Sequence, residues 1–370
     1  MNLAIVRRRL DSIGGAERFI VDAIRSLDAE GLKLTLVAQN AGKALPEGAE
    51  VLLISETMGS RARRYRNFQT GVAAALSGRK FDLVQSHERI LGADIFRAGD
   101  GVHAAWVDRL ARERSPMRRP LLRLNPFHRL LIDTERRMAR QGRLTFVANS
   151  QLVASELSGY YDIPGSRLKV IENGVDLDLY VPPTARDRLD ARRHFGLNAD
   201  QQVAAFVGSG FERKGAFQLL DALALPALDR LTLLVAGRDK QFGELEKRVE
   251  RRGLQSRVRI LGQVPNSKAV LHAADIMVLP TLYDPMPNAT LEAIACGLPV
   301  VTTRDAGIAE ALERSGAGIV STRDPDDLAF AIRKVFDALP RFSAAARNIR
   351  SHYDQRDKIL QWQALYQELS

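Results

Sequence analysis

The chain has 370 residues, 45% of them hydrophobic and 26% charged, and carries a formal net charge of +10. Because single hydrophobic cores stop growing at roughly 250–300 residues, this length predicts two domains. One cysteine, Cys296, excludes an internal disulfide, and we expect it to be a small core residue. The absence of any run of about 18 apolar residues excludes a membrane-spanning helix. The opening segment is too short and wrongly ordered for a signal peptide, so we expect a cytoplasmic protein.

The first half alternates short apolar runs with segments of helical periodicity. We predict strands at Leu3–Val6, Leu34–Ala38, Val51–Ile54, Leu83–Ser86 and Leu144–Ala148, and helices at Ala16–Glu30, Gln69–Ser77 and Gln151–Tyr161. Such alternation is typical of a parallel sheet wrapped by helices.

The second half repeats this pattern more regularly. We predict strands at Val203–Val207, Leu231–Ala236, Val258–Leu261, Ile276–Leu279, Val300–Thr302 and Gly318–Val320, and helices at Ala216–Leu223, Phe242–Arg252, Ser267–Ala273, Ala289–Cys296, Gly307–Leu312 and Pro325–Leu339. A polar stretch over Asn173–Ala199 separates the halves. The predicted fold class is α/β, with two doubly wound, Rossmann-like domains at residues 1–175 and 176–350 facing across a cleft, followed by a helix within 351–370. Ligands in such sheets bind at the carboxyl ends of the strands.

The most informative pattern begins at Asp284. Pro285 and Pro287 keep the chain extended, and we expect Asn288 to cap a helix that begins there. The unpaired N–H groups and positive dipole end at that helix start favour a diphosphate. Glu292, about one turn inside, can accept from a vicinal diol such as ribose, and Asp284 can accept from sugar hydroxyls. Together these groups indicate a nucleotide-sugar site, although each carboxylate alone is more consistent with a solvated surface position.

A glycine-rich turn follows the first strand of each half. In the first, Gly14 and Gly15 precede Arg18 and permit close approach of the backbone to a ligand, or form a simple turn. In the second, the stretch from Gly208 to Gly215 matches neither a Walker loop nor a dinucleotide fingerprint. That stretch carries Arg213 and Lys214 at the start of a helix. These two cations are placed to neutralise a departing diphosphate, the alternative being a solvated pair.

A third candidate segment is the loop that contains Asp100 and His103 among glycines. Its carboxylate and imidazole are candidates for contact with the sugar or with the accepting hydroxyl, although a lone histidine is usually structural. The sequence holds no His/Cys cluster with metal-ligand spacing, so we expect no metal.

Positive charge gathers between Arg109 and Arg143, where eleven arginines stand against three acidic residues. Apolar residues interleave with these arginines at Leu121, Leu122, Leu124, Phe127, Leu130, Leu131 and Ile132. This pattern is typical of a segment that lies on an anionic membrane surface, the alternative being solvated helix faces. We therefore expect peripheral attachment to the inner face of the cytoplasmic membrane, where a phosphorylated, lipid-linked acceptor would be presented.

These residues together resemble the retaining glycosyltransferases of the GT-B fold, family four, and more narrowly the bacterial lipopolysaccharide core glucosyltransferases. The resemblance covers nearly the whole chain, in blocks at Gly14–Arg18, Arg97–His103, Glu172–Asp176, Gly208–Gly215, Val235–Gly237, Leu261–Gly262, Ala273–Asp275 and Asp284–Val301. It implies retention of anomeric configuration, no required metal or cofactor, closure of the cleft, and a C-terminal helix that crosses back to the first domain.

The resemblance also implies roles for single positions. Arg213 and Lys214 resemble the diphosphate-binding pair, and Glu292 the carboxylate that binds ribose. Asp284 stands where the family usually has a glutamate that contacts the transferred sugar, and its shorter side chain leaves the identity of that sugar open. Further donor contacts are expected from Gly208, Gly210, Gln263, Val264, Met286, Asn288 and Ala289, and contacts from the first domain from Gly14, Gly15, Arg18, Asp100 and His103.

The sequence thus predicts a hexosyltransferase that moves glucose, or another hexose, from UDP-glucose or a related nucleotide-sugar to a lipopolysaccharide core or similar lipid-linked glycan. A sugar-nucleotide epimerase of the same fold is the main enzymatic alternative. The non-enzymatic alternative is a basic protein that binds nucleic acid or membrane. With aromatic residues at 6%, the chain lacks interleaved rings for stacking bases, so we expect no nucleic-acid partner.

Overall fold

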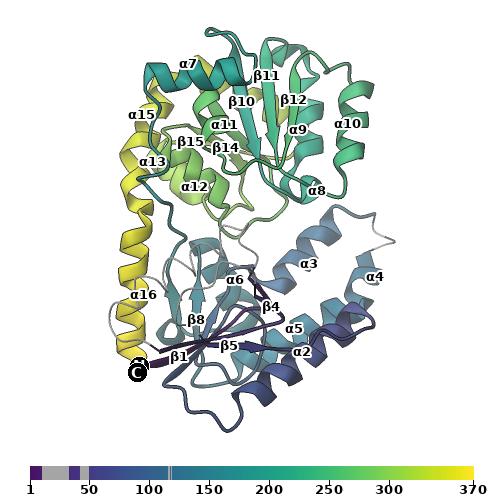
Figure 1. The fold of residues 1–370 in the computed structure, drawn as a ribbon. Coiled ribbons are helices and arrows are strands. Elements are labelled where there is room, and N and C mark those ends of the chain that lie inside the picture. Colours follow the sequence, from purple (N-terminus) through teal and green to yellow (C-terminus); the bar gives the residue numbers. More distant parts are fainter. Residues whose placement is uncertain (11–32, 42–49, 116, 118) are drawn as a thin grey trace. The chain divides into compact units, whose positions relative to one another are not determined.

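The computed structural model describes residues 1–10, 33–41, 50–115, 117 and 119–370, which form two α/β units (Figure 1). The first unit comprises Met1–Asn173 with Arg356–Ser370, and the second comprises Gly174–Gln355. The sequence placed these boundaries at 175 and 350. The expected helix over residues 16–30, and with it Gly14, Gly15 and Arg18, lies outside the described residues.

The first unit is built on a seven-stranded parallel sheet with strand order β5-β3-β1-β6-β7-β8-β9. Its strands are β1 (Asn2–Val6), β3 (Lys33–Ala38), β5 (Glu50–Leu53), β6 (Leu83–Ser86), β7 (Ile95–Arg97), β8 (Thr145–Ala148) and β9 (Leu168–Val170). Two short strands, β2 (Arg9–Leu10) and β4 (Asn40–Ala41), pair separately. The sequence missed β7 and β9 because three residues are too few to show a period of two.

The helices that the structure describes in the first unit lie on both faces of this sheet. They are α2 (Arg61–Leu76), α3 (His103–Arg112), α4 (Arg119–Leu124), α5 (Pro126–Ala139), α6 (Gln151–Tyr161) and α16 (Gln355–Leu369). The expected helix at Gln69 begins earlier, at Arg61, because the Ser60 side chain accepts from the Arg63 N–H and caps it. The arginine-rich segment forms α3, α4 and α5, and Asn125 caps α5 through the Phe127 N–H.

The C-terminal helix α16 packs on the first unit. Trp362 and Tyr366 on α16 share a hydrophobic cluster with Leu3 and Ile5 of β1. The Tyr366 hydroxyl donates to Gln85 Oε1 at 2.7 Å. Because side chains alternate along a strand, Val6 faces the opposite side, toward α2 and α6. The sheet is therefore covered on both faces, with α16 on one side (Figure 1).

The second unit is built on a six-stranded parallel sheet with strand order β12-β11-β10-β13-β14-β15. Its strands are β10 (Gln202–Val207), β11 (Leu231–Ala236), β12 (Val258–Gly262), β13 (Ile276–Leu279), β14 (Val300–Thr303) and β15 (Gly318–Ser321). Strands β11 and β13 are buried at every residue, as expected of central strands in a sheet with helices on both faces. Cys296 is buried in this core, and burial raises the pKa of its thiol to about 12.

The helices of the second unit include one at each of the six predicted places, and three that the sequence did not predict. They are α7 (Ala185–His194), α8 (Phe211–Lys214), α9 (Ala216–Leu223), α10 (Phe242–Arg251), α11 (Lys268–Ala273), α12 (Asn288–Ala295), α13 (Ala309–Ser315), α14 (Pro325–Asp337) and α15 (Leu339–Ile349). The three additional helices are α7, α8 and α15. The boundary between the units, after Asn173, falls at the start of the predicted break over 173–199, and α7 lies within that stretch. Thr184 and Asp187 form a capping box there, and buried ion pairs hold the polar helix in place.

In each sheet the strand order reverses between two neighbouring strands, β1 and β6 in the first unit and β10 and β13 in the second. Connections leave these neighbours in opposite directions, so a crevice opens at their carboxyl ends. In the second unit these ends carry the turn at Gly208 and the loop that reaches Asp284. The candidate site on this unit therefore lies where its topology leaves room for a ligand.

Asp275 links α7 to this sheet. Its Oδ2 atom accepts from the Val203 N–H at 2.8 Å and from Arg192 Nη2 at 3.0 Å, while Oδ1 pairs with Arg188. The side chains of Arg192 and Asp275 are only 3% and 9% exposed. Asp275 thus holds the start of β10, the start of β13 and a polar helix together.

Replacing Asp275 by Ala should strongly destabilise the second unit, because it leaves the buried Arg192 guanidinium without its carboxylate. We expect a loss of about 3–5 kcal/mol in the free energy of unfolding. Urea denaturation followed by circular dichroism measures it. Asp190→Ala, which removes only exposed pairs with Arg186 and Arg193, is the matched control and should cost under about 0.5 kcal/mol. Equal effects of the two substitutions would contradict this account.

Candidate active site

A glycine-rich turn connects β10 to α8 and positions Lys214. Gly208 has a φ of +149°, and a Cβ atom there would lie 2.7 Å from Lys214 Cδ, so the lysine side chain folds back over a position that only glycine can occupy. Gly215, with φ +83°, ends α8, and a Cβ there would lie 2.1 Å from the Pro280 carbonyl oxygen. The Gly210 N–H donates to Asp239 Oδ2 at 2.7 Å, and this hydrogen bond holds the turn in place. The predicted glycines therefore shape a rigid support for the lysine.

Arg213 and Lys214 converge on Asp284. Arg213 Nη1 lies 3.3 Å from Asp284 Oδ2, and Lys214 Nζ lies 3.4 Å from the same oxygen. Arg213 Nη1 also donates to the Tyr283 carbonyl at 2.7 Å. The side chains of Lys214 and Asp284 are 13% and 10% exposed. The structure thus brings together the predicted diphosphate-binding pair and the predicted sugar-binding carboxylate, with a local excess of one positive charge.

The helix α12 begins at Asn288, as expected, but its cap differs from the expectation. Pro287 occupies the cap position with extended backbone angles, and no side chain caps the helix. Asn288 is already the first helical residue, so the prediction that it acts as the N-cap was wrong. Met286 and Ala289 pack in the core at 4% and 9% exposure. If these two residues contact a donor, they can do so mainly through their backbone.

Glu292 on α12 receives a hydrogen bond that the sequence did not predict. The Ser267 hydroxyl, which is 5% exposed, donates to Glu292 Oε2. A second hydrogen bond of 3.3 Å joins Ser267 Oγ to the buried Tyr180 hydroxyl. Because serine has a single hydroxyl proton, which it gives to the carboxylate, Tyr180 must be the donor in that bond. No local pattern marks Ser267, because it meets Glu292 only through the packing of α11 and α12.

The remaining predicted donor contacts follow β12. The Gly237 N–H donates to the Gly262 carbonyl at 2.7 Å, which holds the ends of β11 and β12 together. Gln263 and Val264 come directly after this point, with Gln263 exposed and Val264 half-buried. They therefore lie on the same carboxyl edge of the sheet as the turn at Gly208, because all strands in this sheet are parallel.

In the first unit, Asp100 lies beside the carboxyl end of β1. Arg7 Nη1 is 3.5 Å from Asp100 Oδ2 and 3.9 Å from Glu88 Oε1. Burial of its surroundings opposes ionisation, but Arg7, Arg89 and Arg97 outweigh it and hold the pKa of Asp100 below its usual range. Asp100 is more than half exposed, at 57% for the side chain, and thus presents an ionised carboxylate at the carboxyl edge of this sheet.

His103 has a different environment, inside a buried polar network. Its backbone N–H donates to Glu135 Oε1 at 2.9 Å, and its ring Nε2 lies 2.9 Å from His128 Nδ1. Glu135 also accepts from Arg89 Nε at 2.6 Å and from the Tyr161 hydroxyl. Burial, with Arg89, His128 and Arg61 nearby, lowers the pKa of His103 to about 2. The imidazole is therefore neutral at physiological pH and, unlike the exposed Asp100, is buried among other side chains.

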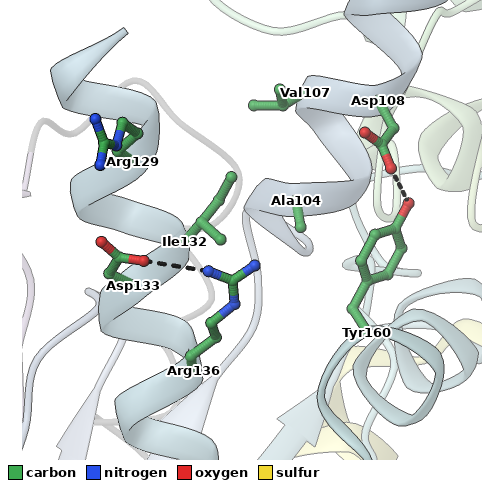
Figure 2. A pocket seen from close by; sticks show the side chains of 8 residues that line it. All are labelled: Ala104, Val107, Asp108, Arg129, Ile132, Asp133, Arg136 and Tyr160. Carbon is green, nitrogen blue, oxygen red and sulfur yellow. Dashed lines mark hydrogen bonds and ion pairs between the residues drawn. The ribbon is translucent and has the colours of Figure 1, made fainter. Parts of the chain in front are cut away.

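A pocket of about 450 Å³ lies in the first unit between α3, α5 and the end of α6 (Figure 2). Ala104, Val107 and Ile132 supply apolar lining. On one side Arg136 Nη1 donates to Asp133 Oδ1 at 3.3 Å, and on the other the Tyr160 hydroxyl donates to Asp108 Oδ2 at 2.8 Å. Arg129 and these polar residues complete the lining. An apolar floor between hydroxyl, carboxylate and guanidinium groups suits a sugar ring, which has both C–H faces and hydroxyls.

No helix among the described residues is both long and apolar enough to cross a membrane. Within the same residues, no three His, Cys, Asp or Glu side chains are grouped so that they could hold a metal ion.

Two family models match the chain in succession. Residues 13–179 match the model described as Glycosyltransferase Family 4, and residues 187–351 match the one described as Glycosyl transferases group 1. The lipopolysaccharide glucosyltransferase WaaG of Escherichia coli strain K12 is 26% identical to this chain over 353 residues, which are 93% of this chain and 92% of WaaG.

Solved structures agree with these matches. The crystal structure of WaaG, described as a glycosyltransferase involved in lipopolysaccharide biosynthesis, aligns with a TM-score of 0.85 at 24% identity and covers 100% of this chain and 99% of its own. Anabaena Alr3699/HepE in complex with UDP-glucose aligns with a TM-score of 0.74 at 19% identity, over 100% of both chains. At these identities the likeness establishes the fold, and the two family matches establish the type of enzyme. The chain therefore belongs to the glycosyltransferases of the GT-B fold, with a family 4 domain followed by a group 1 domain.

Proposed function

We propose that this glycosyltransferase moves a hexose, with glucose preferred, from a UDP-linked donor to a lipopolysaccharide core or a related lipid-linked glycan, with retention of anomeric configuration and without a metal. The observation that carries this proposal is the convergence of Arg213, Lys214 and Asp284 at the point where the strand order of the second sheet reverses. The similarity to a lipopolysaccharide glucosyltransferase over 93% of the chain supports the choice of sugar and acceptor.

The two cations suit the charge that develops during the transfer. The bond between C1 of the sugar and the phosphate oxygen breaks, a bond from C1 to the acceptor oxygen forms, and the acceptor proton leaves with UDP or passes to water. Negative charge therefore grows on the departing pyrophosphate. Fixed donors in a water-poor site stabilise such charge without reorganising at the moment of reaction. Lys214, held over Gly208 and 13% exposed, is such a donor.

The nucleoside end of the donor is assigned to α12 and its neighbours. The bond from Ser267 fixes the orientation of the Glu292 carboxylate, because it holds one of the two oxygens in a set direction. A carboxylate held in this way is suited to the two hydroxyls of ribose. Gln263 and Val264, on the same edge of the sheet, are proposed to lie against the base. We therefore propose that the donor binds to the second unit.

The acceptor is assigned to the first unit. Asp100 presents an ionised carboxylate at the carboxyl edge of the first sheet and is proposed to lie near the accepting hydroxyl. The pocket in Figure 2 begins at Ala104, directly after His103, the first residue of α3. We assign this pocket to a sugar of the acceptor glycan. His103 is given a positioning role, because its neutral ring and backbone N–H support the start of α3.

The segment before α5 carries the features of a membrane contact. Leu121 and Leu124 on α4 are 65% and 62% exposed, and Met117 just before it is 89% exposed. Arg112 and Arg114 nearby are also exposed. Exposed leucines beside arginines are unfavourable in water and favourable at an anionic lipid surface, where each group finds its own environment. We propose that α4 holds the enzyme at the inner face of the cytoplasmic membrane.

Replacing Lys214 by Ala should weaken UDP binding by roughly 10–100-fold, the value of one hydrogen bond between charged groups. The turnover of UDP-glucose with inner-core lipopolysaccharide as acceptor should fall by roughly 100-fold or more. Isothermal titration calorimetry and a transfer assay measure the two effects. Lys240→Ala removes an exposed cation just after Asp239, which holds the Gly208–Gly215 turn, and should change neither. Wild-type UDP affinity in the Lys214 variant would argue against the diphosphate role.

Replacing Ser267 by Ala should raise the KM for UDP-glucose by about tenfold and change kcat by less than about twofold, because it loosens a group that binds donor but does not react. Ser267→Thr keeps the hydroxyl and should restore most of the affinity. Ser321→Ala, which removes another half-buried hydroxyl of the same unit, is the control. An equal fall in kcat and kcat/KM for Ser267→Ala would refute this role for Glu292.

Replacing both Leu121 and Leu124 by Asp should release the protein from membranes. Wild-type protein is expected to float with vesicles that contain phosphatidylglycerol and to remain behind with phosphatidylcholine alone. Because each buried leucine contributes about 1.5–3 kcal/mol, the double variant should bind at least about tenfold more weakly. Leu360→Asp on α16, where the leucine is 61% exposed, should still float. Negligible flotation of the wild-type protein with both lipids would refute the proposal that α4 binds the membrane.

A further inference from the structure

We propose that Asp284 acts as an internal counter-ion, which occupies Arg213 and Lys214 until the pyrophosphate of the donor displaces it. The carboxylate then becomes available to the hydroxyls of the sugar. This inference rests on the proposed function, since it requires that the two cations bind a pyrophosphate. It adds an order of events, in which the carboxylate is released toward the sugar only when the leaving group is in place.

The first observation is that one oxygen serves both cations. Arg213 Nη1 and Lys214 Nζ lie 3.3 Å and 3.4 Å from Asp284 Oδ2. Both cationic groups are thus directed at the carboxylate, in the position where a phosphate oxygen would otherwise bind them. A carboxylate carries one negative charge, whereas the pyrophosphate of a nucleotide-sugar carries two and has more acceptor oxygens. The donor is therefore the stronger partner for the same pair.

The second observation is that the backbone of Asp284 is held by two hydrogen bonds to a neighbouring loop. The Asp284 N–H donates to the Asp305 carbonyl at 3.0 Å, and its own carbonyl accepts from the Gly307 N–H at 2.9 Å. These two bonds join the loop after β13 to the loop after β14. Because the loop is anchored in this way, displacement of the carboxylate would be a movement of the side chain and not of the loop.

The third observation is that the cations have supports of their own. Arg213 Nη1 donates to the Tyr283 carbonyl at 2.7 Å, independently of the carboxylate. Lys214 is confined above Gly208, where a Cβ atom would lie 2.8 Å from Nζ. Both cations should therefore keep their places after the carboxylate leaves. Asp284 is therefore a counter-ion that competes with the donor for the two cations. It is not needed to hold the cations in position for the donor.

The consequence is that removing the charge of Asp284 has opposite effects on binding and on transfer. Free UDP must displace the carboxylate and gains no sugar contact in return, so it should bind more tightly once the competitor is gone. Transfer needs the carboxylate at the sugar and should slow down. A carboxylate that only contacts sugar would leave UDP binding unchanged, and one that only positions the cations would weaken it.

The test measures UDP binding to Asp284→Asn by titration calorimetry, together with transfer from UDP-glucose. We expect the Kd for UDP to fall by at least about fivefold and turnover to fall by at least about tenfold. Asp284→Ala should change both in the same directions, and Asp284→Glu, which keeps the charge, should not tighten UDP binding. Thermal melts followed by circular dichroism identify any variant that is not folded.

The matched control is Glu212→Gln, which removes one negative charge from the same helix as the two cations. Glu212 is exposed and is engaged with Gln241 at 3.4 Å, so its loss tests the effect of net charge alone. UDP affinity should stay within about twofold of wild type. Unchanged or weaker UDP binding in folded Asp284→Asn, or equal tightening in Glu212→Gln, would overturn the inference. Absence of UDP binding by the wild-type protein would instead overturn the proposed function.

Discussion

The reversal of strand order between β10 and β13 is the constraint on which the rest of the second unit depends. Because connections leave these strands in opposite directions, their carboxyl ends are not covered by a crossing helix. Two loops meet there, one with Arg213 and Lys214 and the other with Asp284. Glycine at 208 and 215 allows the first loop to approach the sheet, and the bonds to residues 305 and 307 hold the second.

The net charge of this site determines how it can bind an anion. Two cations and one carboxylate leave a single positive charge in a partly buried place, where electrostatic interactions are stronger than in bulk water. A site with cations alone would be destabilised by their mutual repulsion, and a site with balanced charge would attract a pyrophosphate less. A carboxylate that a donor can displace, as we propose for Asp284, would avoid both drawbacks. It would offset the repulsion between the cations in the empty protein and would leave when the more highly charged pyrophosphate binds.

In the first unit, buried groups form a hydrogen-bonded network around Glu135. Glu135 accepts hydrogen bonds from Arg89, from the backbone of His103 and from Tyr161. Such a fully bonded network rigidifies the start of α3 and with it one wall of the pocket in Figure 2. Asp100, by contrast, remains exposed beside Arg7. The first unit thus combines a rigid support with one accessible carboxylate.

The sequence by itself determined the α/β alternation, the glycine-rich turn with its two cations and the start of α12, because these depend on residues close in the chain and on their backbone preferences. It also named Asp284 and Glu292 as site candidates of a glycosyltransferase. Only the tertiary structure decided that Asp284 faces Lys214, that Ser267 holds Glu292 and that His103 is buried against His128. Those contacts join segments far apart in the sequence, and the packing of strands and helices, which leaves no local signal, brings them together.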